Sequence, residues 1–341
     1  MAWGIEIQDL DKDIALMGGR RVNSNSKNMK IELLGAAVTL LISVVALVSA
    51  AYAWYVANNI VKAETSAISA KTNGFILQIA NREQGAQHGG NQMSLAASTV
   101  GNKIAPASTD DMQNWYVCKG WTDQGLVNSY EKVTFSTADG AKYGQYESGG
   151  KTLFAYSKSE FIVYTITQTG LADVYLDGSD GSPIQVEVDN GVLADPAAKA
   201  TVLGSLRVGI TTQELQSDGK TPTGDETLKV VYAPKAVSGK GNDVSAIEGK
   251  WTCIYNESLQ EVTYPHFDSR ELSGWVATRT GEDYSAPDGT NKIASRVGYN
   301  GMLLRVYIWM EGTDADCVNN AVEEDAATYS VSVKLAGIQA N

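Results

Sequence analysis

The sequence has few of the residues from which catalytic and metal sites are most often built. It contains three cysteines and two histidines in 341 residues; His88 lies in a Gly- and Gln-rich stretch and His266 in a turn-like Tyr-Pro-His segment. It has no glycine-rich nucleotide motif, no G-x-S-x-G turn and no H-E-x-x-H helix. We therefore expect a non-enzymatic protein, and its many carboxylates leave a glycosidase as the open enzymatic alternative.

Basic residues are also in deficit, with 27 Lys and Arg against 39 Asp and Glu and a formal net charge of -12. Five acidic and five basic residues precede Trp54, so the net charge belongs to residues 54–341. An acidic surface repels phosphate backbones and anionic lipid. We therefore expect no nucleic-acid partner, and the charge suits solubility outside a cell or cation binding.

The three cysteines are Cys118, Cys253 and Cys317, and no C-x-x-C or Cys/His spacing predicts a zinc site. In an oxidising exterior two of them could pair and leave the third free, and the sequence does not say which two. The equal alternative is three buried thiols that pack as small apolar side chains. All three residues are thus disulfide candidates.

The chain has one long hydrophobic run, the 24 uncharged residues from Leu33 to Val56. At 1.5 Å per residue, such a helix can cross a hydrocarbon core of about 30 Å. Basic residues near a span stay on the cytoplasmic side, and most of those near this run precede it: Arg20, Arg21, Lys27 and Lys30. The sequence predicts a transmembrane or signal-anchor helix over 31–56, a membrane partner through 33–56 and a cytoplasmic N-terminus.

The same segment also fits a cleaved signal peptide. Ala51 and Ala53 supply the A-x-A triplet that signal peptidase recognises, with the cut after Ala53. The apolar run is longer than the core of an ordinary signal peptide, which favours a retained anchor. Both alternatives stay open, and both place the chain from Trp54 onward at the cell surface or outside the cell.

The apolar run divides the chain into four predicted parts. Residues 1–30 form a cytoplasmic tail or a long n-region, residues 31–56 the apolar helix, and residues 57–72 a stalk. Residues 73–341 form an extracellular domain, within which a Gly- and Ser-rich stretch suggests an inserted subdomain at about 236–300.

Residues 73–341 are rich in alternating strand-forming segments. The segment EFIVYTITQT at 160–169 is apolar on both faces, which predicts a central strand of a β-sandwich, and 172–176 is its expected hairpin partner. MLLRVYIWM at 302–310 and a half-buried strand at 329–335 close the domain. Asp195-Pro196 marks the start of a short helix.

Two polar segments are candidate ligand sites. The turn from Asp177 to Ser182 places Asp177 and Asp180 at a spacing that can hold calcium, although turn chemistry alone also explains these residues. Aromatic residues between 110 and 150 could stack on sugar rings or fill gaps over a sheet; they are Trp115, Tyr116, Trp121, Tyr143 and Tyr146. The alternative function is therefore a surface module that binds glycan or calcium.

Three segments resemble a loose group of Gram-positive, largely clostridial, surface proteins. They are the span ending in AYAWYVANN, the internal LGSLRVGI, and the terminal VYIWMEGTDADC followed by YSVSVKL. This layout is similar to that of the camelysin/TasA group of secreted matrix proteins. The resemblance implies a jelly-roll-like β-sandwich, export by a signal segment, and fibres made by passing a terminal strand between subunits. Camelysin-type metalloprotease activity does not carry over, because the H-E-x-x-H helix is missing.

The complete fold prediction is mainly β: a jelly-roll-like β-sandwich ectodomain with short helices, preceded by one N-terminal transmembrane or signal helix. The predicted function is an extracellular structural or fibre-forming subunit that associates with itself, needs no cofactor other than the calcium considered above, and acts on no substrate. A pilin-like subunit is a further alternative, since type IV pilins also join an apolar N-terminal helix to a β-rich head. Asn28 to Glu32 lacks the glycine of the pilin processing site and places the glutamate one residue early.

Overall fold

The computed structural model describes residues 61–72, 77–86, 88, 95–98, 102–109, 111–121, 127–135, 144–148, 150–188, 204–233, 250–255, 258–263, 273–281, 283–314, 317 and 328–340. The chain divides into two compact units, 1–53 and 54–341. The predicted span at 31–56, the Ala51–Ala53 processing site and the predicted helix at Asp195 lie outside the described residues. Within the described part, no helix is long and apolar enough to cross a membrane.

The second unit is mainly β, as the sequence predicts. Its strands are β1 (Val61–Thr72), β2 (Leu77–Asn81), β3 (Leu95–Ser98), β4 (Asn102–Ile104), β5 (Ala107–Ser108), β6 (Tyr116–Trp121), β7 (Val127–Lys132), β8 (Gln145–Ser148), β9 (Lys151–Phe154), β10 (Ser157–Thr165), β11 (Ala172–Asp177), β12 (Ile184–Val188), β13 (Leu206–Leu215), β14 (Pro222–Tyr232), β15 (Lys250–Tyr255), β16 (Ser258–Thr263), β17 (Val276–Thr280), β18 (Asp283–Ser285), β19 (Ala294–Val297), β20 (Met302–Met310) and β21 (Thr328–Gln339). A short 3₁₀ helix, η2 (Ser273–Trp275), precedes β17.

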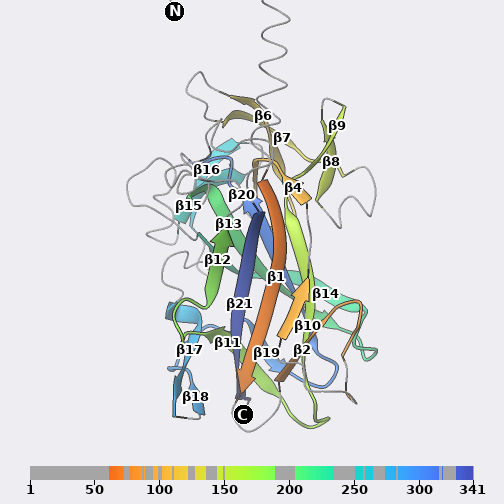
Figure 1. Cartoon of the computed structure of the whole chain (residues 1–341), viewed down its shortest axis with the longest axis vertical. Coiled ribbons are helices and arrows are strands. Elements are labelled where there is room, and N and C mark those ends of the chain that lie inside the picture. The colour runs from red at the N-terminus through yellow and green to blue at the C-terminus, as the bar shows by residue number, and fades with distance from the viewer. Residues whose placement is uncertain are drawn as a thin grey trace, which may run out of the picture. The chain divides into compact units, whose positions relative to one another are not determined.

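Two large sheets contain most of these strands (Figure 1). The larger has the order β18-β17-β11-β21-β1-β4-β9-β8. In addition, β12 pairs with β21, β19 with β11, and β3 with β1. The smaller has the order β14-β13-β20-β10-β2. Strand β20 lies at its centre, antiparallel to both β13 and β10. The prediction of a strand at 302–310 is thus confirmed, whereas the strand predicted at 160–169 begins at Ser157 and ends at Thr165.

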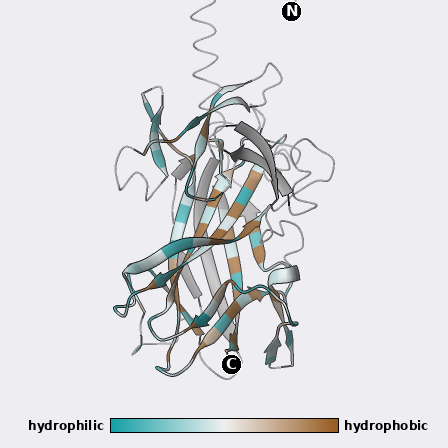
Figure 2. Cartoon of the chain, turned by 180° about the vertical axis from the view of Figure 1, so that it is seen from behind, coloured by the Kyte–Doolittle hydropathy of each residue, from teal (hydrophilic) through white to brown (hydrophobic). Residues whose placement is uncertain are grey.

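The main buried cluster takes side chains from both large sheets. The smaller sheet contributes Leu77, Ile79, Phe161, Val163, Leu206, Val208, Ile210, Val230, Leu304, Val306 and Ile308. The larger contributes Ile104, Ala172, Val174, Leu176, Ile184, Val331, Val333 and Leu335. Alternate residues of each strand enter this cluster because successive side chains point to opposite faces of a sheet. Figure 2 shows the corresponding alternation of hydrophobic and hydrophilic residues along the strands.

The opposite face of β20 is also buried, which explains the apolar character of both faces in MLLRVYIWM. Tyr307 and Trp309 pack there with Trp115, which precedes β6, and Tyr156, which precedes β10. The ring centroids of Trp115 and Tyr156 are 4.5 Å apart, and Trp115 meets Trp309 edge to face at 5.7 Å. Such aromatic pairs stabilise a fold beyond the area that they bury.

Residues 61–72, assigned to a stalk from the sequence, instead form a strand of the larger sheet. Strand β1 pairs in parallel with β21 along one side and antiparallel with β3 and β4 along the other. In Figure 1 it runs beside β21 along the length of the sheet. The stalk interpretation is corrected for these residues. Their small and polar side chains show no apolar stripe, but their backbone pairs with β21 and, at 61–63 and 66–69, also with β4 and β3.

The hairpin expected between 160–169 and 172–176 is wrong. Strands β10 and β11 do not form a hairpin, because β10 pairs with β20 and β2 whereas β11 pairs with β21, β17 and β19. The turn at Thr167–Gly170 carries the chain from one sheet to the other. Within the stretch at about 236–300, β17 and β19 join the larger sheet through β11, and β15 and β16 form a separate two-stranded sheet. An inserted subdomain there stays a prediction.

Candidate binding cleft

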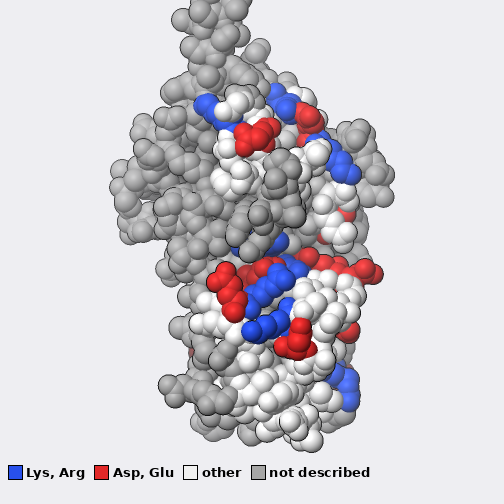
Figure 3. Space-filling model, turned by 90° about the vertical axis from the view of Figure 1, so that its right-hand side faces the viewer, with Lys and Arg blue, Asp and Glu red and all other residues white. Residues whose placement is uncertain are grey.

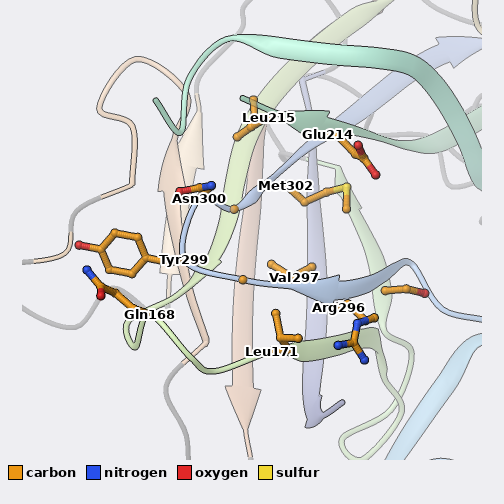
Figure 4. Close-up of a pocket in the computed structure, with 12 residues that line it drawn as sticks. Gln168, Leu171, Glu214, Leu215, Arg296, Val297, Tyr299, Asn300 and Met302 are labelled. Atoms are coloured by element: carbon orange, nitrogen blue, oxygen red, sulfur yellow. The ribbon is translucent and has the colours of Figure 1, made fainter. Parts of the chain in front are cut away.

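A cleft of about 840 Å³ opens between the end of β13, the turn after β10, and the segment from β19 into β20. Figure 4 shows Glu214, Leu215 and Met302 along one side of the cleft, opposite Leu171 and Val297. The remaining polar lining consists of Gln168, Ser295, Arg296, Tyr299 and Asn300. The cleft thus combines an apolar base with amide, hydroxyl, carboxylate and guanidinium groups.

A second cleft of about 440 Å³ continues along the same side of the β13–β14 hairpin. Glu214, Ser295 and Met302 line both clefts, so the two form one groove. The second part adds β14 side chains, among them Asp225 and Lys229. The groove therefore follows a strand hairpin and offers hydrogen-bonding groups along an extended path.

The turn from Gly298 to Gly301 fixes one end of the cleft against β10. The amide of Gly301 donates to the Gly298 carbonyl at 3.1 Å, and the amide of Thr165 donates to the same carbonyl at 3.1 Å. Gly301 has a φ of +82°, and a Cβ there would lie 3.0 Å from the Val163 carbonyl oxygen. Only glycine meets both requirements without strain. The tight turn places Tyr299 and Asn300 at the edge of the cleft.

Asp173 holds the opposite end. Its Oδ1 accepts a hydrogen bond of 3.0 Å from the Arg296 amide, and its Oδ2 accepts one of 2.6 Å from Lys292 Nζ. This hydrogen bond raises the pKa of Lys292. Arg296 has a φ of 50°, in the left-handed region that is uncommon for residues other than glycine. Strained residues of this kind cluster at ligand sites, and the Arg296 side chain lies in the cleft lining (Figure 4).

A network of charged side chains supports the β13–β14 wall from the other face of the smaller sheet. Arg305 binds Glu160 (Nε to Oε1, 2.8 Å), Glu226 (Nη1 to Oε2, 3.0 Å) and the Gln213 side-chain oxygen (Nη2 to Oε1, 2.8 Å). Arg82 binds the second oxygen of Glu160 at 2.6 Å. Figure 3 shows basic and acidic side chains next to one another across the middle of one face, with a further group nearer the top.

Glu160 is the centre of this network. Burial alone would raise the pKa of its carboxyl, but the hydrogen bonds from Arg305 and Arg82 and the nearby Lys158 outweigh burial and lower the pKa. Glu160 is therefore ionised and paired at neutral pH. Gln213 connects the network to β14, since its Nε2 donates a hydrogen bond of 2.7 Å to the Gly224 carbonyl. The network thus braces the hairpin that forms one wall of the groove.

Asp177 and Asp180, the predicted calcium ligands, have different surroundings. Asp177 is buried; its Oδ1 accepts from the Ser179 amide and its Oδ2 from the Tyr284 hydroxyl, both at 2.9 Å. Asp180 is exposed, and its carbonyl oxygen accepts from Lys334 Nζ at 3.0 Å. Among the described residues, no group of three or more His, Cys, Asp or Glu could hold a metal ion. The calcium hypothesis gains no support here and stays a prediction.

The aromatic residues considered for sugar stacking are partly placed. Trp115, Tyr116 and Tyr146 are buried, which for these three favours gap filling over stacking on a sugar. The side chains of Trp121 and Tyr143 lie outside the description. The aromatic ring that does line the cleft is Tyr299, in a Gly-Tyr-Asn-Gly turn whose composition is the one sequence signal that could have pointed to it.

The histidines and cysteines are likewise only partly described. His88 stacks on Tyr299 with ring centroids 3.4 Å apart, and burial lowers its pKa. His266 lies outside the described residues. Cys118 and Cys317 are free thiols. Cys253 lies on β15, where only the backbone is described.

No family model, curated protein or solved structure matches the chain. The resemblance to Gram-positive surface proteins therefore stays a prediction. The functional interpretation rests on the geometry of the chain itself, above all on β1 and on the groove beside the β13–β14 hairpin.

Proposed function

We propose that this chain is a non-enzymatic extracellular surface protein that assembles into a fibre or matrix by exchange of β1 between copies. The N-terminal apolar segment exports or anchors it, and the outer region is a jelly-roll-like β-sandwich. The shared buried cluster of the two large sheets supports the sandwich arrangement. The observation that carries the assembly proposal is the parallel pairing of β1 with β21.

Strand β1 has partners on both sides. It pairs with β21 from Lys62 opposite Thr328 to Thr72 opposite Gly337, with one register shift between Ala63 and Ser66. On its other side it pairs with β3 and β4. Parallel neighbours cannot be joined by a tight hairpin turn. No short connection therefore ties β1 to β21, and β1 is held by its pairing within the sheet.

This arrangement makes β1 exchangeable. If β1 leaves, β21 on one side and β3 and β4 on the other expose unpaired N–H and C=O groups. A β1 strand from a second copy satisfies these groups with the same register, which is the strand-addition mode of association. Because each copy both donates and accepts a strand, repetition produces a linear filament.

A disulfide lock across β1 and β21 tests the proposal. Ala67 lies opposite Ser332 in the register, so Ala67→Cys with Ser332→Cys should lock β1 into its own chain. The matched control is Gln185→Cys with Ser332→Cys, which joins β12 to the same position of β21. Peptide mapping checks that each bond is intramolecular.

The locked β1 variant should remain monomeric in electron micrographs and sedimentation, whereas the β12 control and the reduced β1 variant should form filaments. Filaments from the fully locked β1 variant would contradict strand exchange. The absence of filaments from the wild-type protein under all assembly conditions would reject the structural function as a whole.

The groove favours a second candidate function, a surface module that binds glycan. Its extended path and its mixture of hydroxyl, amide and carboxylate groups over apolar side chains suit a neutral oligosaccharide. Saturable binding on a glycan array that Glu214→Ala weakens would support this function. Glu131→Ala, at an exposed ion pair elsewhere, should leave binding unchanged. Equal glycan binding by the wild-type protein, Glu214→Ala and Glu131→Ala would rule out the groove as the binding site.

A further inference from the structure

The fold brings Cys118 and Cys317 to one buried region from opposite ends of the outer domain. The Cys118 amide donates to the Pro106 carbonyl at 3.2 Å. The next residue, Ala107, accepts at 2.9 Å from the Gly312 amide and forms a β-bridge with Glu311. The Cys317 amide donates at 3.0 Å to the carbonyl of Asp314 in the same turn. Backbone contacts thus place both β6 and the segment after β20 against β5 and the residue before it.

The side chain of Tyr130 connects β6 with the segment after β20. Tyr130, which pairs with Cys118 across β6 and β7, packs on the Gly312 backbone: a Cβ there would lie 3.2 Å from the ring. Burial raises the pKa of Tyr130, and the charges of Glu311, Cys317 and Cys118 raise it further. Tyr130 thus lies beside Cys118 in the sheet and against the segment that leads to Cys317.

The two thiols also affect each other directly. After burial, the strongest influence that raises the pKa of Cys317 is the charge of Cys118, ahead of Asp314 only three residues away along the chain. This influence agrees with the backbone contacts, which bring the two segments against the same residues. Both are free thiols, Cys118 half-buried and Cys317 buried.

We propose that Cys118 and Cys317 form a disulfide when the protein is exported, and that Cys253 is the cysteine left out. The oxidant is a second disulfide, either a small-molecule disulfide or that of a thiol oxidoreductase. The thiolate of Cys118, the less buried of the two, attacks this disulfide to form a mixed disulfide and release one thiol. The thiolate of Cys317 then attacks the Cys118 sulfur, and the second thiol leaves. Two S–H groups are lost and one S–S bond forms, while the oxidant gains two S–H groups.

Burial decides when this bond forms. Burial raises the pKa of Cys118 to about 12 and that of Cys317 well above its ordinary value, and the thiolate is the reactive form. The bond therefore forms during folding, before the segment after β20 packs on β6, and forms slowly once the reduced protein has folded. It fastens that segment to β6 and does not depend on strand exchange or glycan binding.

The test is disulfide mapping on the full chain. Protein is recovered from the outside of cells, quenched in acid, alkylated without reduction, digested and analysed by mass spectrometry. The expected result is one linked peptide pair containing Cys118 and Cys317, with Cys253 alkylated. A bond to Cys253, or alkylation of all three cysteines, would overturn the proposal.

Two variants sharpen the test. Cys253→Ser should keep the linked pair and the mass deficit of two hydrogens relative to the reduced protein. Cys118→Ser should remove both and lower the midpoint of thermal unfolding to that of the reduced wild-type protein. The wild-type map remains decisive even if a variant fails to fold, because it needs no substitution.

Discussion

Arg207 and Asp314 form an ion pair inside the protein, with Nη2 and Oδ2 2.5 Å apart and side chains 2% and 1% exposed. Arg207 Nη1 also donates to the carbonyls of Gly204 (2.7 Å) and Leu206 (3.0 Å). The pair joins the start of β13 to the turn after β20. It thereby connects LGSLRVGI with VYIWMEGTDADC, two of the segments on which the resemblance to surface proteins was based.

Removing Asp314 should destabilise the fold strongly. Asp314→Ala leaves the Arg207 charge buried without its partner, which should lower the free energy of unfolding by about 3 to 5 kcal/mol. Urea titration measures this loss. Glu131→Ala breaks the exposed ion pair with Lys119 and should cost less than about 1 kcal/mol. Equal losses in the two variants would show that burial of the Arg207 pair does not matter.

Glu311 should make stability depend on pH. Burial raises its pKa to about 7, although Arg207 nearby and hydrogen bonds from Trp309 and Thr313 act in the opposite direction. The folded state therefore binds a proton more tightly than the unfolded state does. The contribution of Glu311 to stability is full below the unfolded pKa and falls as pH rises toward 7, by about 3 kcal/mol in total.

Glu311→Gln isolates this effect because glutamine has the size of glutamate and no charge. Thermal unfolding of the two proteins between pH 5 and pH 8 should show a steeper loss of stability with rising pH in the wild type. The difference between the two curves should be constant above about pH 8, where Glu311 is ionised in both states. Parallel curves across the whole range would mean that Glu311 titrates normally.

Gly301 should tolerate a side chain far less well than Gly181. Both have positive φ, +82° and +79°, so alanine is strained at either position and should cost about 1 kcal/mol from that cause alone. A Cβ at Gly301 would also lie 2.8 Å from Ile162 Cγ2, whereas no atom of the described residues would lie within 4 Å of a Cβ at Gly181. Overpacking should add about 1 to 3 kcal/mol in Gly301→Ala. Chemical denaturation of both variants measures the difference, and equal costs would contradict the close approach of the turn to β10.

The Tyr284 hydroxyl should contribute to stability, unlike that of Tyr130. Tyr284→Phe leaves one oxygen of the buried Asp177 without its donor and should cost about 1 to 3 kcal/mol. The Tyr130 hydroxyl is buried and has no hydrogen-bond partner among the described residues, so Tyr130→Phe should be neutral or stabilising. Urea titration compares the two. A larger loss at Tyr130 would contradict these hydrogen-bond assignments.

The sequence by itself determined the mainly β class and the positions of several strands. The segments at 172–176 and 302–310 lie in strands that begin where the sequence indicated. This succeeds because the two-residue alternation of side chains is a local property, written in neighbouring residues.

Only the tertiary structure decided which strands are neighbours. Residues 61–72 and 328–339 pair although the rest of the domain separates them, and β10 and β11 separate although they are adjacent in sequence. Likewise, the groove beside Glu214 and the contact of Ala107 with Glu311 and Gly312 depend on distant segments of the chain. A local pattern specifies which face of a strand is buried but not what covers that face, and the choice of partner is made by packing of the whole core.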